Sequence, residues 1–143
     1  MMLFSLAKGR AVIALATAET LATVTGLAIA PTPARIAALR LKVKGTGTLV
    51  KWTDVQAFGP DAVTVRSADK IRTDSDMSVP ADKHHDPIGK RVLTDTGQDV
   101  GILGDVDFDE TTGHIQRLIV GSQEIAGERL LGVGTYAVVI AAP

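Results

Sequence analysis

Three aspartates at alternate positions are the first residues whose spacing suggests chemistry. In an extended strand Asp105, Asp107 and Asp109 would share one face, with apolar side chains on the other. This spacing can begin a calcium loop, but that loop needs a glycine and a glutamate where this chain has Glu110 and Gln116. We therefore expect no calcium site, and the aspartates are either solvated or form an acidic contact surface.

The only histidine cluster is His84-His85-Asp86, whose side chains are reasonable ligands for zinc or nickel. Adjacent side chains in an extended segment point in opposite directions, so one segment does not easily chelate with both histidines. These residues are weak metal candidates, and we expect no metal and no cofactor. No serine has the context of a nucleophile elbow, so we also expect no enzyme.

A basic stripe runs along the clearest predicted strand, residues 38–44, in which Arg40, Lys42 and Lys44 alternate with apolar residues. The stripe could bind RNA or an acidic protein, or it could be the solvated face of a strand. Within this chain its natural complement is the acidic face of Asp105, Asp107 and Asp109.

Composition sets the class of protein. The chain has 143 residues, 45% of them hydrophobic and 3% aromatic, with a net charge of -1 and no cysteine. This balance gives no case for wrapping nucleic acid, and it excludes disulfides and thiolate metal sites. The apolar run at 11–18 is too short to span a bilayer, so we expect a cytoplasmic protein without a membrane anchor.

Short alternating runs separated by turn formers predict an all-β fold made of small barrels. The run 106–120 predicts a β-hairpin, in which Gly113 supplies the tight reversal. The same order of apolar and glycine positions occurs about eighty residues earlier, which indicates a duplicated module. We predict a first module at 1–71, a polar linker at 72–87 and a second module at 88–143.

The second module has no obvious counterpart of the segment 52–55 or of the strand 62–66, so we expect it to be truncated at its C-terminal end. A barrel without its last strand leaves an unpaired edge. This edge predicts that the other module or another chain covers it, and hence a homodimer.

Some residues around the hairpin and in the first module carry a family resemblance. They are Pro87 to Val92, Gly97, Gly101, Asp105 to Asp109, Thr112-Gly113 and Leu130 to Gly134, with 49–55 and 61–65 in the first module. The second module resembles the PRC-barrel domain, a small β-barrel found in the photosynthetic reaction-centre H subunit and in a ribosome maturation factor, and the first module resembles the C-terminal half of the same domain. The resemblance implies structural roles for Trp52, Asp54, Gly89, Gly101 and Gly113.

What the resemblance implies about function is a non-catalytic adaptor that self-associates and holds a protein partner. Two alternatives remain open: an RNA or ribosome-assembly factor, for which the stripe of Arg40, Lys42 and Lys44 would be the contact, and a metal-binding protein that uses His84, His85 and Asp86.

Overall fold

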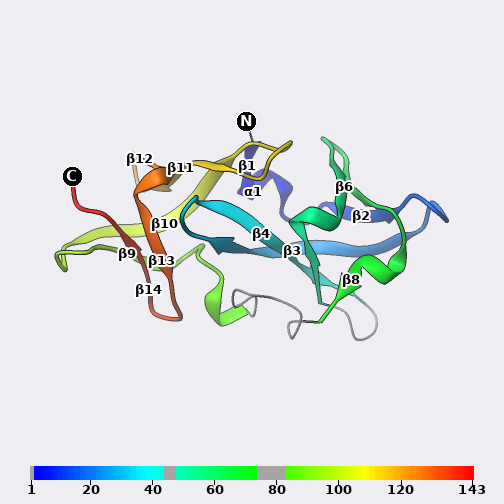
Figure 1. Cartoon of the computed structure of the whole chain (residues 1–143), viewed down its shortest axis with the longest axis horizontal. Helices are drawn as coiled ribbons and strands as arrows, with labels where there is room; N and C mark the ends of the chain where they lie inside the picture. The colour runs from blue at the N-terminus through cyan, green and yellow to red at the C-terminus, as the bar shows by residue number, and fades with distance from the viewer. Residues whose placement is uncertain (1, 44–47, 74–82) are drawn as a thin grey trace.

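The computed structural model describes residues 2–43, 48–73 and 83–143 and contains two β-sheets (Figure 1). We call residues 2–73 the first half and residues 83–143 the second half. The halves lie side by side along the longest axis of the molecule, with β1 and α1 between them (Figure 1). The predicted all-β fold is confirmed. Its α-helix, α1, covers only Phe4–Ala7, and no helix among the described residues is long and apolar enough to cross a membrane.

The first sheet has the strand order β6-β7-β2-β3-β4-β5-β8. Its long central hairpin is β3–β4, and the turn at residues 31–34 lies where the two prolines predict it. The strands are β2 (Ala11–Ala14), β3 (Thr20–Ala30), β4 (Arg35–Lys42), β5 (Leu49–Lys51), β6 (Val55–Phe58), β7 (Ala62–Val65) and β8 (Ile71–Arg72), with short 3-10 helices η1 (Trp52–Asp54) and η2 (Ala68–Lys70).

The second sheet has the order β12-β11-β10-β9-β14-β13, and β1 (Met2–Leu3) from the N-terminus also pairs with β10. The predicted hairpin is present as β10–β11, although β10 begins earlier than expected, at Asp99. The elements are η4 (Lys83–His85), β9 (Arg91–Thr94), β10 (Asp99–Phe108), β11 (Ile115–Val120), β12 (Gln123–Ala126), η5 (Gly127–Arg129), β13 (Leu130–Val133) and β14 (Ala137–Ile140).

The two sheets have the same strand order, β6-β7-β2-β3-β4-β5 in one and β13-β14-β9-β10-β11-β12 in the other. The pairings also agree in direction, because β2 pairs antiparallel with β3 and parallel with β7, as β9 does with β10 and β14. The registers define counterparts, which include Val12 with Val92, Leu27 with Val106, Ile29 with Phe108, Ile36 with Ile115, Leu39 with Leu118 and Leu41 with Val120.

The expectation that the second half is truncated is wrong for its last strand. β14 pairs parallel with β9, in the position that β7 takes beside β2. The turn before each strand is closed by the same bond, from Gly59 N to Ala62 O and from Gly134 N to Ala137 O. The sequence hides this likeness because Gly127 replaces Trp52 at the 3-10 turn. Among the described residues, η2 and β8 have no counterpart after β14.

One hydrophobic core runs through both halves. Its cluster includes Val12, Leu27 and Val63 from the first half and Phe108 and Leu118 from the second. Alternation along most strands explains this, because inward positions are mostly Val, Ile, Leu, Ala or Phe. At the ends of β3 and β10 consecutive residues are buried, so both faces of these strands are covered there. The halves therefore bury their apolar faces against each other as well as within each sheet.

Candidate functional site: the junction of the two halves

The two central hairpins meet through a reciprocal backbone contact. Ile36 N–H donates to Gly113 O at 2.8 Å, and Ile115 N–H donates to Ala34 O at 3.0 Å. Arg35 and His114 form an antiparallel bridge between these bonds. Ile36 and Ile115 are counterparts, so each half gives and accepts the same bond. This is the geometry of an isologous dimer interface, formed here within one chain.

The segment that leads into each half lies against the other half. β1 pairs with β10, in the register Met2 with Phe108, and α1 lies against the same strand. In the other direction Asp86, just before β9, forms an ion pair of 2.5 Å with Arg40 of β4. Two segments are thus exchanged between the halves, and each anchors on a central hairpin.

A hollow of about 410 Å³ lies at this junction. Arg40 and Asp86 line it together, and a Cβ on Gly26 beneath them would come within 2.2 Å of both side chains, so one of them would have to shift. Asp86 is fully engaged, since its other oxygen accepts the Ile88 N–H at 3.0 Å. The lining is Phe4, Ser5, Lys8, Thr25, Arg40, Asp86, Ile88, Gly104 and Asp105, which carries as many acidic as basic side chains.

Trp52 joins the halves on another side of the junction. Its indole lies on Gly113, where an added Cβ would come within 2.7 Å of the ring. Gly113 also has φ +79, which favours glycine. Trp52 packs edge-on against Phe108, with centroids 6.1 Å apart, and stacks on Phe58 at 5.8 Å. The structural roles expected for Trp52 and Gly113 are thus explained by one contact.

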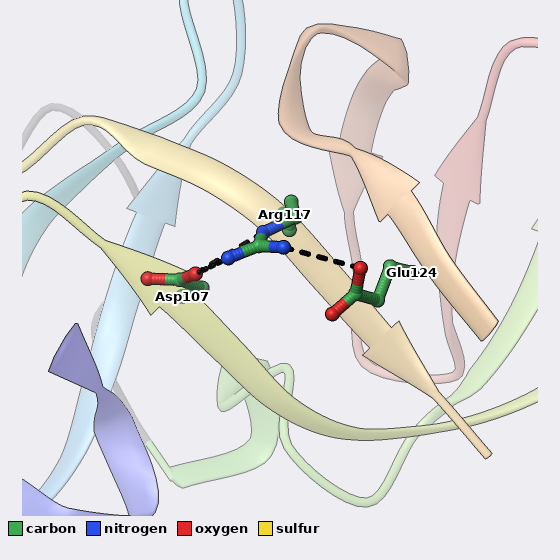
Figure 2. A network of polar contacts seen from close by, with 3 residues as sticks. All are labelled: Asp107, Arg117 and Glu124. Carbon is green, nitrogen blue, oxygen red and sulfur yellow. Dashed lines mark hydrogen bonds and ion pairs between the residues drawn. The ribbon is translucent and has the colours of Figure 1, made fainter. Parts of the chain in front are cut away.

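Asp107 is buried. The expectation that it belongs to an exposed acidic face is therefore wrong. Arg117 donates to its Oδ2 from Nε at 3.1 Å and from Nη2 at 2.5 Å, while Nη1 of the same guanidinium binds Glu124 at 3.1 Å (Figure 2). Asp107 Oδ1 is buried and has no hydrogen-bond partner among the residues that the structure describes. The hydrogen bond to Asp107 raises the pKa of Arg117.

The other two aspartates of the predicted acidic face also bind within the fold. Asp105 accepts hydrogen bonds from Ser5 N at 3.0 Å and from Ser5 Oγ at 2.5 Å, so it holds α1 in place. Asp109 accepts from Thr111 N at 2.7 Å and Thr112 N at 3.1 Å, and these bonds lower its pKa. The three carboxylates therefore serve three different local structures.

The residues of the basic stripe do not act as one surface, and the residues of the histidine cluster do not act as one site. Arg40 is paired with Asp86, Lys42 is exposed, and Lys44 lies outside the described residues. The expected match between this stripe and the acidic face does not form for Arg40. Among the described residues no group of three metal-ligating side chains comes together, and His84 is exposed while Asp86 binds Arg40.

The remaining residues with an expected structural role have local partners. Asp54 lies 3.6 Å from Arg72 Nε. Gly89 has φ +89 and donates its N–H to Leu103 O at 2.7 Å, as Gly9 does to Val24 in the first half. Gly101 has φ +127, and its N–H donates to Asp99 at 2.9 Å.

Sequence reasoning missed three exposed apolar side chains of the second half, which we call the apolar positions. Ile102, Leu131 and Tyr136 are 46%, 44% and 73% exposed. The registers give their counterparts in the first half as Thr23, Gln56 and Asp61. The fold therefore accepts polar residues at these places. This difference appears only when each residue is compared with its counterpart in the other half, and the strand register is needed to identify that counterpart.

A comparison with known protein families gives a match for the second half. Residues 81–141 match the family model of the PRC-barrel domain. The match begins inside the predicted linker 72–87, most of which lies outside the described residues, and it includes the segment through which Asp86 reaches Arg40. No curated protein matches the chain.

Proposed function

We propose that this protein is a non-enzymatic adaptor that holds a protein partner through the apolar positions Ile102, Leu131 and Tyr136. The observation that carries the proposal is their exposure in the half that matches the PRC-barrel domain, at places where the first half has polar residues. A single exposed apolar side chain is common on any protein surface, so the proposal rests on the difference between the two halves at all three places.

The first half is, in this proposal, a second and more diverged PRC-barrel copy. Its strand order and its reciprocal contact with the second half support this assignment. A rigid pair of barrels suits a scaffold, because its surface is already ordered before a partner binds. Because Asp105, Asp107 and Asp109 are used in internal bonds, the proposal gives them neither a catalytic role nor a role in holding the partner.

The test exchanges the apolar positions for their counterparts in the first half. The variant Ile102→Thr, Leu131→Gln, Tyr136→Asp should keep its thermal midpoint but lose at least about tenfold in partner affinity, roughly 1.4 kcal/mol or more. Partners captured by the wild-type chain from its host are identified and their dissociation constants measured. The control is Leu15→Ser, which removes an equally exposed apolar side chain from the first half. Unchanged affinity in the triple variant would contradict the proposal.

The homodimer remains a prediction, but an unpaired barrel edge no longer supports it, because β14 pairs with β9. The apolar positions would therefore have to carry self-association. Light scattering of the wild-type chain and the triple variant at equal concentration measures this directly. The RNA alternative is not favoured by a specific observation, since Arg40 of the basic stripe is paired with Asp86.

A further inference from the structure

We propose that the hollow between the two halves binds a small organic carboxylate, whose charge lies beside Lys8 and Arg40 and whose apolar body lies against Phe4 and Ile88. We call this site the junction hollow. Its volume of about 410 Å³ falls in the range of small-molecule sites, roughly 300–1,000 Å³. The inference goes beyond the proposed function, because none of the apolar positions lines the junction hollow.

The junction hollow opens where both central strands have an irregular register. The register of β3 shifts at Thr25 and that of β10 shifts at Gly104, and both residues line the hollow. The two shifts occupy equivalent positions in the two halves. A bulge bends its strand and re-aims side chains, and bulges are frequent next to binding and active sites. The hollow is therefore a regular feature of how the two halves meet.

The two sides of the junction hollow differ in character. Lys8 and Ile88 are counterparts, since each precedes a glycine whose N–H donates to a central strand, β3 after Lys8 and β10 after Ile88. Arg40 also belongs to the β3 side, because its guanidinium lies over Gly26. The β3 side therefore carries two cations, whereas the β10 side carries Ile88 and Asp105.

Both carboxylates of the lining are already used by the fold. Asp86 accepts from Arg40 with one oxygen at 2.5 Å and from a backbone N–H with the other at 3.0 Å. Asp105 accepts from the Ser5 hydroxyl with one oxygen, and from the N–H groups of Ser5 and Val106 with the other. Neither carboxylate therefore has an oxygen left without a donor to attract a cationic ligand.

The donors of the lining, in contrast, are only partly used. Among the described residues Asp86 is the only partner of the Arg40 guanidinium, and Arg40 Nε is buried without a hydrogen bond. The Lys8 ammonium and the Thr25 hydroxyl have no partner in the part of the chain that the structure describes. Lys90 donates to Asp86 O at 2.5 Å and adds a third cation nearby. Unused donors and surplus positive charge favour a ligand that supplies acceptors and a negative charge.

The remaining lining determines the rest of the ligand. Phe4 is buried and Ile88 is half-buried, and both face the junction hollow. An aliphatic or aromatic body would remove their surface from water, which a simple inorganic anion would not do. Small-molecule sites commonly combine apolar lining with a few polar groups that fix the orientation of the ligand. The junction hollow therefore suits a carboxylate with an apolar body better than a free anion.

The probes are phenylacetate and hexanoate, each titrated into the full chain while its amide signals are followed by NMR. We expect at least one of them to give saturable shifts at Thr25, Ile88 and Gly104, with a dissociation constant of about 1 mM or lower. The neutral amide of each acid lacks the charge, and acetate lacks the apolar body. Each of these control compounds should bind at least about tenfold more weakly.

Two variants locate the ligand. Lys8→Gln should weaken binding of the better probe by about fivefold or more, and Thr25→Val, which removes only the hydroxyl, by about threefold. The matched control is Lys42→Gln, at an exposed lysine outside the lining, which should change the affinity by less than about twofold. Circular dichroism confirms that all three variants are folded.

The proposal is overturned if neither probe gives saturable shifts at the junction hollow, or if the amide or acetate binds as tightly as the acid. It is also overturned if Lys8→Gln has no more effect than Lys42→Gln. None of these results bears on the apolar positions, whose exchange variant tests the adaptor proposal separately.

Discussion

At the scale of single residues, the contact between Trp52 and Gly113 connects the two halves through side-chain packing. The glycine has a positive φ and lies under the indole, so two separate costs oppose any side chain there. One is backbone strain, which depends on the residue itself. The other is the steric conflict with Trp52, which disappears when the ring is removed. Substitutions can separate these two costs.

We predict that Gly113→Ala lowers the free energy of unfolding by on the order of 2 kcal/mol, from positive φ and overpacking together. In a Trp52→Ala background the same change should cost only about 1 kcal/mol, because the strain alone remains. Urea denaturation followed by far-UV circular dichroism measures all four proteins. Equal costs in both backgrounds would mean that the indole does not restrict position 113.

The carboxylate of Asp109 gives a prediction about pH. Hydrogen bonds from Thr111 N and Thr112 N lower its pKa below the ordinary value of 3.8. A carboxyl whose pKa is lower in the folded state stabilises the fold above its unfolded pKa, and this contribution is lost as the pH falls through the folded value. The difference in unfolding free energy between wild type and Asp109→Asn should therefore shrink in acid. NMR titration of the side-chain carbon gives the folded pKa, and a value at or above 3.8 would refute this account.

At the scale of elements, the same place in the two central hairpins is occupied in different ways. Asp107 pairs in register with Arg117, and the counterparts in the first half are Ala28 and Ala38. The alanines are buried, and so is Asp107. The hairpin therefore accepts either a small apolar pair or an ion pair at this place. A buried carboxylate without its cation would instead destabilise the fold.

We predict that Arg117→Ala alone is more destabilising than Asp107→Ala with Arg117→Ala. The single change leaves Asp107 buried without its cation, while the double change reproduces the alanine pair of the first half. Thermal denaturation at neutral pH ranks the two variants against wild type. A double variant less stable than the single one at neutral pH would contradict this reading.

At the scale of the whole molecule, the shared core and the exchanged segments make each half depend on the other. Phe108 of the second half is fully buried and touches Trp52 and Phe58 of the first. Removing its ring opens a cavity where both halves meet. The halves are therefore expected to unfold in one transition, as a single domain does.

We predict that Phe108→Ala lowers the free energy of unfolding by about 3–5 kcal/mol and lowers the transition of both halves together. Trp52 fluorescence reports on the junction and far-UV circular dichroism on all strands, so their midpoints should coincide in wild type and variant. Phe108→Leu, which keeps most of the volume, should cost about 1.5 kcal/mol or less. Two separate transitions would show that the halves are independent domains.

The sequence predicts the elements well where alternation and turn residues are strong. The β10–β11 hairpin, the β4 strand, the tight segment at Trp52 and the turn at residues 31–34 all appear in the structure. The sequence does not reveal the last strand of the second half, because Gly127 replaces Trp52 in the turn that precedes it. The prediction of an exposed acidic face is wrong for Asp107. Alternation shows on which side of a strand a carboxylate lies, but it does not show which other segments cover that side.

By itself the sequence determined the β class and the pairing of neighbouring strands, because both follow from period-two alternation and local turn chemistry. Only the tertiary structure decided that the leading segments cross to the opposite half, that Asp107 is buried, and that Trp52 lies on Gly113. These contacts join residues far apart in the chain, and no local sequence pattern predicts which of those residues come together. The apolar positions belong to the same group, since they are recognised only after the two sheets have been aligned.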